Sequence, residues 1–177
     1  MVLAVPVWAT NLVPGQFETA ALLNTIGNNG TFLTDPPDFV GTQNTVQSIA
    51  ATTWGAIGLD TEQFDSYGGH STVTNTSRYV AQVTGWYTVC GVVAFSLNGT
   101  GARGSRLQVN GSPVSGACSF IPGLSSNSVG VATPTRDLFL NATDYVEVAG
   151  WQNSGGALNT TVNSDFSSGL WVRFSHA

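Results

Sequence analysis

Three glycines near the middle of the chain have the spacing of a dinucleotide-binding loop. Gly99, Gly101 and Gly104 match the pattern G-x-G-x-x-G, in which backbone amides approach a pyrophosphate. Such a loop must run from a strand into a helix, because the helix N-terminus receives the phosphates. Residues 105–111, "SRLQVNG", instead alternate polar and apolar side chains, which predicts another strand. We therefore expect the glycines to join two antiparallel strands rather than to bind a nucleotide.

The histidines do not suggest a catalytic site. Only His70 and His176 are present, one beside a turn and one near the end of the sequence. The chain has no G-x-S-x-G nucleophile elbow and no H-E-x-x-H metal motif. Asp144 and Glu147 fall on opposite faces of a predicted strand, so they do not form a carboxylate pair. We predict that the protein is not an enzyme and uses no cofactor.

An acidic segment, "DTEQFDSYGG", places Asp60, Glu62 and Asp65 in one predicted loop. Carboxylates at this density can hold Ca²⁺. Their spacing matches no defined calcium loop such as the EF-hand, so a solvated turn is the favoured interpretation. We therefore assign no metal to this segment.

A second candidate for binding is "GWQNSGGALNTT", where Trp151, Gln152 and Asn153 end a predicted strand beside a flexible loop. An aromatic ring and amide groups suit sugar recognition, by stacking and by hydrogen bonding. A packed tryptophan followed by an ordinary turn explains the same residues and is the favoured interpretation. Binding of a cell-surface glycan at these residues stays an alternative hypothesis.

The composition excludes several kinds of partner. Charged residues make up 8% of the 177 residues, lysine is absent, and the net charge is −5. Nucleic-acid binding needs clustered Lys or Arg, whereas the five arginines are scattered. No segment is apolar over the length of a membrane span. The opening "MVLAVPVWAT" lacks a basic start and is interrupted by Pro6, so we expect synthesis in a cytoplasm without a signal peptide.

Two cysteines, Cys90 and Cys118, form no C-x-x-C pair, which argues against a zinc site. A disulfide between them is conceivable in an oxidising compartment. The chain is not a small cysteine-dense scaffold, so free buried thiols are the favoured interpretation.

The chain divides into two regions with different patterns. Residues 1–41 contain one helical pattern, from Gln16 to Ile26, which Gly27 is expected to end, and then an extended linker, "LTDPPDFVG". Residues 42–177 form short predicted strands separated by Gly, Asn or Pro clusters, without a second helix. This order predicts an all-β antiparallel sandwich. A lone short helix is marginal in water, so it needs a partner: the sandwich, its own copies or a larger assembly.

The predicted strand from Trp86 to Leu97 is apolar on both faces. Its inward face carries Tyr87, Val89, Gly91, Val93, Phe95 and Leu97. A half-exposed antiparallel strand normally has a polar outer face. The outer face here, extended by the last strand, carries small apolar residues and tryptophan instead: Trp86, Thr88, Cys90, Val92, Ala94, Trp171 and Arg173. We infer that another subunit covers this face; the alternative is that residues 1–41 fold back over it.

Two segments resemble the globular head domain of the first complement component, a tumour-necrosis-factor (TNF)-like jelly roll. "YVAQVTGWYTV" resembles its F-x-V-x-x-x-G-x-Y signature, and "DLFLNATDYVEVAGWQNSGG" resembles its L-x-x-G-D-x-V-x-V strand pair. The matching positions are Tyr79, Ala81, Val83, Gly85 and Tyr87, then Leu138, Leu140, Asp144, Val146 and Val148. Tyr79 replaces the usual Phe, and Thr143 stands where Gly is usual. The resemblance implies a TNF-like antiparallel jelly roll for residues 42–177.

The N-terminal region, "VPGQFETAALLNTIGNNGTFLTDPP", resembles the start of tail-fibre-like and other minor virion proteins of actinobacterial bacteriophages. Those proteins open with a short helix and an F-L-x-x-P-P linker before a jelly roll. The resemblance implies a homotrimeric virion structural protein: a decoration, fibre or spike that contacts capsid, collar or tail proteins. It also suggests that residues 1–41 attach to the particle while the jelly roll faces outward, where it could aid host adhesion. The expected attachment residues are Phe17, Leu22, Leu23, Ile26 and Phe32.

Two alternative functions stay open from the sequence. One is a glycan-binding receptor-recognition module, and the other is a secreted bacterial complement-like domain. A position of the gene among capsid and tail genes would exclude the latter.

Overall fold

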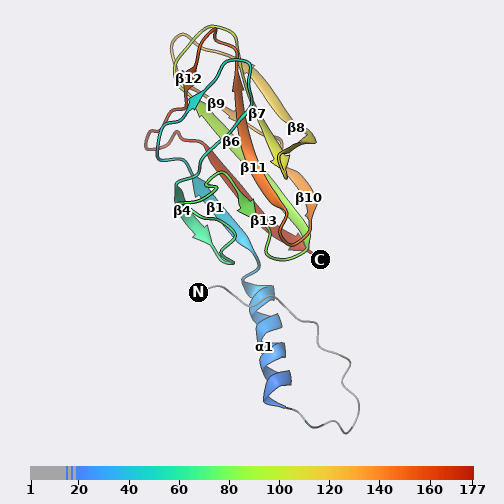
Figure 1. Ribbon diagram of the computed structural model, residues 1–177. Helices are drawn as coiled ribbons and strands as arrows, with labels where there is room; N and C mark the ends of the chain where they lie inside the picture. The colour runs from blue at the N-terminus through green and yellow to red at the C-terminus, as the bar shows by residue number, and fades with distance from the viewer. Residues whose placement is uncertain (1–14, 16, 18) are drawn as a thin grey trace.

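The computed structural model describes residues 15, 17 and 19–177. The expected start of the helix at Gln16 and the opening segment of residues 1–10 lie outside the described residues. Two antiparallel β-sheets pack face to face, and one helix, α1, extends from one end of them (Figure 1). The predicted all-β antiparallel jelly roll with a short N-terminal helix is confirmed.

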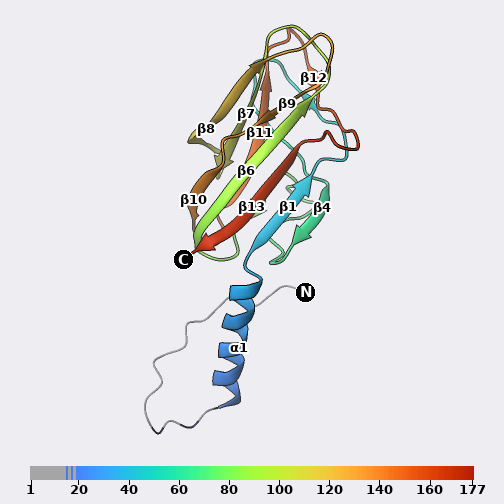
Figure 2. The same ribbon diagram turned by 180° about the vertical axis from the view of Figure 1, so that it is seen from behind.

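The strands form two large sheets and one small one. A six-stranded sheet has the order β10-β6-β13-β1-β4, with β9 also paired to β6 (Figure 2). Its strands are β1 Asp38–Thr42, β4 Thr61–Asp65, β6 Gly85–Phe95, β9 Val129–Ala132, β10 Arg136–Leu140 and β13 Gly169–His176. A five-stranded sheet has the order β3-β11-β7-β8, with β5 paired to β11. Its strands are β3 Gly55–Ala56, β5 Tyr79–Val80, β7 Ala102–Val109, β8 Ser112–Pro122 and β11 Tyr145–Gln152, while β2 Ser48–Ile49 pairs with β12 Leu158–Asn159.

Two segments that the sequence placed outside strands belong to the six-stranded sheet. The end of the expected linker forms β1, which begins at Asp38, ahead of the predicted boundary at residue 42. Its Phe39 is completely buried and stacks on Tyr79, so this segment is part of the core and not a connection to it. The acidic segment also differs from its predicted loop, since residues 61–65 form the edge strand β4. Both strands are short and are held by pairing with distant residues, which local pattern does not reveal.

Helix α1 spans Ala20–Thr34 and does not end at Gly27 as predicted. The Thr19 side chain caps its N-terminus by accepting a hydrogen bond from the Leu22 amide. Gly27 in a helix interior costs about 1 kcal/mol relative to alanine. Burial of Phe32, whose ring contacts Tyr67 and Phe174, contributes more than that, roughly 2 kcal/mol. A tertiary contact at the far end therefore extends the helix past the glycine.

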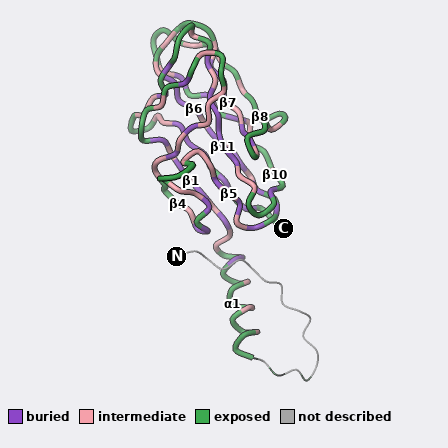
Figure 3. The backbone as a smooth tube through the Cα atoms, viewed as in Figure 1, coloured by how far each residue is buried: buried purple, intermediate pink, exposed green. Residues whose placement is uncertain are grey.

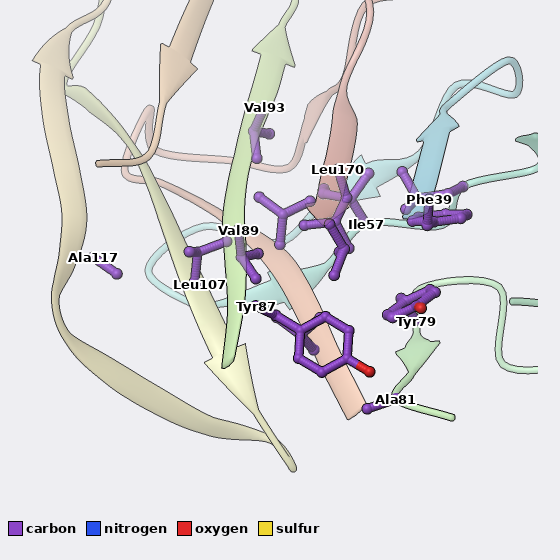
Figure 4. Close-up of a cluster of buried hydrophobic side chains, with 14 of the residues drawn as sticks. Phe39, Ile57, Tyr79, Ala81, Tyr87, Val89, Val93, Leu107, Ala117 and Leu170 are labelled. Carbon is purple, nitrogen blue, oxygen red and sulfur yellow. The ribbon is translucent and has the colours of Figure 1, made fainter. Parts of the chain in front are cut away.

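The core lies between the two large sheets (Figure 4). The inward face of β6 is confirmed for Tyr87, Val89 and Val93, which are completely buried, and Leu107 and Leu170 reach the same space from β7 and β13. Leu97, expected on this face, is exposed because it follows the last residue of β6 and lies in the next loop.

The glycine-rich segment crosses from one sheet to the other. It leaves β6 in the six-stranded sheet and enters β7 in the five-stranded sheet, so the expectation that it joins two paired strands is wrong. Gly104 lies within β7, and a side chain there would collide with the ring of Phe120. Gly101 has φ +73 and passes so close to Asn153 that a side chain would also collide. The glycines thus serve backbone geometry and close packing.

Two turns lead into strands of the five-stranded sheet. Asn110 and Gly111, both with positive φ, connect β7 to β8 as the hairpin that their sequence predicts. The second turn leads into β11, and its Thr143 has φ +82, a strained value for a β-branched residue. Asp144 holds this turn, because its carboxylate accepts hydrogen bonds from the Asn110 side chain and from the Asn141 amide. The same hydrogen bonds lower the pKa of Asp144.

Thr143→Gly is expected to raise the free energy of unfolding by about 1 kcal/mol, since glycine adopts this φ without strain. Denaturant unfolding measures the change. Ala142→Gly is the matched control: Ala142 lies in the same turn outside the left-handed region, so its replacement should lower stability. Equal destabilisation by both changes would contradict strain at Thr143.

Candidate self-association interface

The outward face of the six-stranded sheet carries aromatic side chains on neighbouring strands. Trp171 of β13 is the register partner of Cys90 on β6 and of Val40 on β1. Trp86 faces Phe139 across β6 and β10, with 5.7 Å between ring centroids in an edge-on arrangement. Antiparallel pairing thus turns residues far apart in the sequence into one apolar surface, which we call the open face.

The open face leaves much of its aromatic surface in contact with solvent. Trp86, Trp171 and Phe139 are 38%, 37% and 50% exposed. His176 stacks on Trp86 at 6.0 Å and continues the aromatic surface. Phe139 and His176 were missed by sequence reasoning. Alternation with buried Leu140 in "RDLFL" would have placed Phe139 outward, whereas His176 depends on the pairing of β13 with β6.

The described part of the N-terminal region does not cover the open face. Figure 2 looks onto the six-stranded sheet, and α1 extends beyond the end of this sheet rather than across it. Within the described residues, the alternative that residues 1–41 fold back over the sheet is therefore wrong. The contact of Phe32 with Phe174 fixes this direction, because it holds the end of the helix beneath the edge of the sandwich.

Ala94 does not belong to the open face, contrary to the sequence prediction. It is 1% exposed, because the loop after β12 covers it. The Ala94 amide donates to the Ser168 hydroxyl, and the Thr161 amide donates to the Ala94 carbonyl. Strand alternation placed Ala94 outward correctly but carried no information about the loop. Trp86, Thr88, Cys90, Val92, Trp171 and Arg173 all lie on the open face as predicted, fully or partly exposed.

Polar groups on the open face are paired with one another. The Thr88 hydroxyl donates to the Asp137 carboxylate at 2.6 Å. The Arg173 guanidinium lies 4.0 Å from the Asp38 carboxylate. Burial raises the pKa of Asp38, although Arg173 opposes that shift. A partner that covers this face therefore meets polar groups that already have local partners, which lowers the desolvation cost of association.

The helix offers a separate exposed surface (Figure 3). Leu23 and Ile26 of α1 are exposed, as is Phe17 ahead of it, and Leu22 is half-buried. The prediction that Phe32 is an attachment residue is wrong, because its side chain is buried against the jelly roll. Leu33, which the sequence analysis did not select, is largely exposed at the same end of the helix.

The predicted glycan residues are mostly committed to internal contacts. Gln152 is completely buried: its Nε2 donates to the carbonyls of Ile49 and Gly156, and its Oε1 accepts from the amide and hydroxyl of Ser154. The prediction that Gln152 binds sugar is therefore wrong. The Asn153 side chain accepts a hydrogen bond from the Ala102 amide.

Trp151 is only partly buried and belongs to an aromatic cluster on the outward side of the five-stranded sheet. Its ring contacts Phe120 at 5.3 Å and Trp54 at 6.3 Å. Arg106 lies over Trp54, with its guanidinium carbon 4.2 Å from the ring centroid. The interpretation of Trp151 as a packed tryptophan accounts for these contacts.

The acidic residues have separate partners. The Asp65 carboxylate accepts from the amides of Gly69 and His70, and Glu62 contacts the His70 ring at 2.7 Å. Asp60 accepts from the Asn44 amide. Burial acts to raise the pKa of Asp60, but hydrogen bonds from Thr45 and Asn44 outweigh it and lower that pKa. Among the described residues, no group of three or more His, Cys, Asp or Glu could hold a metal ion.

Both cysteines are free thiols, in agreement with the favoured interpretation that they form no disulfide. Their expected burial is wrong, since Cys118 is exposed on β8 and Cys90 is only half-buried on the open face. Within residues 15, 17 and 19–177, no helix is both long and apolar enough to cross a membrane.

Solved structures similar to this fold include TNF-family proteins. Murine APRIL matches with a TM-score of 0.59 at 12% identity, over 78% of this chain and 98% of that chain. The fold is a TNF-like jelly roll. Eiger TNF from S. frugiperda also matches, with a TM-score of 0.51 at 16% identity, over 80% of this chain and 92% of that chain. No protein-family model and no curated protein matches the sequence. At these identities the likeness concerns the fold alone.

Gln152→Met is expected to lower the free energy of unfolding by about 3 kcal/mol, because it removes four hydrogen bonds and leaves buried partners unpaired. Denaturant unfolding measures the change. Gln63→Met, at an exposed position of β4, is the matched control and should change stability by less than about 0.5 kcal/mol. A small effect at Gln152 would contradict its structural role.

Proposed function

We propose that the protein is a homotrimeric jelly-roll structural protein of a phage particle, displayed on the particle surface as a decoration, fibre or spike. The observation that carries the trimer is the open face, where Trp86, Phe139 and Trp171 are exposed on one sheet. The TNF-like fold supports self-association as the way to cover it. The particle role is supported by the resemblance of the N-terminal region to minor virion proteins.

Association through the open face follows from the cost of leaving it in water. Covering a large apolar side chain is worth about 1.5–3 kcal/mol, so three partly exposed aromatics supply several kcal/mol of driving force. A stable interface buries about 800 Å² on each partner, so the neighbours of the three aromatics on the sheet must also be covered. We propose no catalytic role for any residue of the chain.

Attachment to the particle is assigned to the exposed side of α1. Leu23, Ile26 and Leu33 present apolar side chains on a helix that leaves the jelly roll at one end (Figure 1). A helix with this many exposed apolar residues gains stability from a partner. In this arrangement the jelly roll faces away from the particle and is free to contact a host cell.

The purified chain should be a trimer of about 55 kDa, three copies of the 18.4-kDa chain, by light scattering coupled to size exclusion. Trp171→Glu should convert it to a monomer, because a charge would be buried at the centre of the interface. Phe120→Glu is the control on the other sheet, where it replaces a more exposed aromatic, and it should stay trimeric. A monomeric parent chain would refute the proposed assembly.

Incorporation into particles should depend on the helix surface. Leu23→Glu combined with Ile26→Glu should abolish incorporation, measured by mass spectrometry of purified particles, and leave the jelly roll folded. Asn24→Glu with Asn28→Glu adds the same charge to another side of α1 and should be tolerated. Equal incorporation of all three proteins would refute attachment through this surface.

A further inference from the structure

A hollow lined by amides and hydroxyls lies at the β4 edge of the six-stranded sheet. Its volume is about 470 Å³, and it lies between the start of the sandwich and the loop that precedes β13. Its polar lining includes Thr42, Gln43, Asn44, Thr61, Gln63 and Asn163. We call this hollow the polar groove. None of the described residues that line it is ionisable.

Gln43 forms part of the lining of this groove and has an unsatisfied polar atom. Its side chain is 2% exposed, and its Oε1 has no hydrogen-bond partner among the described residues. A buried amide oxygen without a partner costs about as much as a lost hydrogen bond, so such atoms are rare in folded proteins. A hydrogen-bond donor from outside the chain would remove this cost.

The walls of the polar groove are held by backbone hydrogen bonds. The Gln43 amide donates to the Ser168 carbonyl at 2.9 Å. Asn163 and Phe166 exchange backbone hydrogen bonds at 2.9 and 3.3 Å, which closes the loop on one side. On the other side of the groove, Thr42 of β1 is the register partner of Thr61 of β4. The groove is therefore shaped before any ligand arrives, which reduces the ordering cost of binding.

The groove continues into two neighbouring hollows. One, of about 470 Å³, shares Val162 and Asn163 with it, and the other, of about 230 Å³, shares Gln43. Asp60 lines the smaller one, and its carboxylate is occupied by the Asn44 amide. A ligand longer than one ring can therefore extend from the polar groove along the edge of the sandwich.

We propose that the polar groove binds a neutral oligosaccharide. Carboxamides present a donor and an acceptor in one plane, and hydroxyls present both, which matches the paired donor and acceptor of each sugar hydroxyl. A charged ligand would find no opposite charge in the lining, and an apolar ligand would leave the amides unpaired. Gln63, Asn44 and Asn163 bind along the chain of rings. Gln43 Oε1 is itself enclosed, so the Gln43 side chain must turn toward the groove before a sugar hydroxyl can donate to it. This site replaces Trp151–Asn153 as the candidate for sugar binding.

This inference extends the proposed role in host adhesion, but its test requires neither a particle nor a trimer. The full-length protein is applied to an array of neutral di- to tetrasaccharides printed beside sialylated and sulfated ones. Calorimetry with a retained saccharide then measures affinity. We expect retention of neutral saccharides only. Retention of none, or equal retention of acidic ones, would overturn the proposal whatever the oligomeric state.

Two variants identify the site. Gln43→Met keeps the length of the side chain and removes the unpaired amide, so the melting temperature should be unchanged or higher, whereas affinity should fall at least tenfold. Gln63→Ala, at an exposed position, should weaken binding similarly without affecting the fold. If Gln43→Met lowers stability, the affinity of Gln63→Ala decides whether the polar groove is the binding site. Asn24→Ala on α1 and Trp151→Ala are controls that should bind as the parent does. Parent-like affinity in Gln63→Ala, or loss of binding in Trp151→Ala alone, would overturn the assignment.

Discussion

A continuous row of aromatic rings joins the two sheets to the helix, and the rest of the structure depends on it. Phe39 of β1 stacks on Tyr79 of β5 at 5.1 Å, and Tyr79 contacts Tyr87 of β6. From Tyr87 the row continues through Phe174 to Phe32 of α1, at 5.3 and 5.1 Å. Each such ring buries about 150–250 Å², so the row supplies a large part of the core. It also sets where the helix leaves the jelly roll, and so keeps α1 away from the open face.

The two surfaces assigned to binding use short-range chemistry, because the chain has few charges. On the open face, aromatic rings offer apolar area to another copy, and the charged pair of Asp38 and Arg173 is already matched within the sheet. In the polar groove, Gln43, Gln63 and Asn163 offer amides to a neutral ligand. Neither surface relies on long-range electrostatic attraction, which suits a protein with 8% charged residues. The two surfaces lie on different parts of the six-stranded sheet, so assembly and adhesion can operate together.

The candidate interface could be read from strand alternation only in part. Period-two alternation along β6 placed Trp86 and Val92 on the outward face, since neighbouring side chains on a strand must point to opposite sides. The same rule placed Ala94 there, although a loop from the end of the chain covers it. Gln152 was misjudged for a related reason: its side chain turns inward, where it donates to the carbonyl of the distant Ile49, and the loop that follows closes over it through Ser154 and Gly156. The sequence gives no reason to select Gln43, because a buried amide without a hydrogen-bond partner can be recognised only when its surroundings are known.

By itself the sequence determined the β class, most strand positions and the hairpin at Asn110–Gly111, since alternation and turn chemistry act between near neighbours. Tertiary structure decided the rest. It placed Phe39 in the core instead of a linker, extended α1 beyond Gly27 through the burial of Phe32, and led Gly99–Gly104 from one sheet to the other. Each of these outcomes depends on contacts between residues far apart in the sequence. Their free energy outweighs local preferences of about 1 kcal/mol, and no local pattern records it.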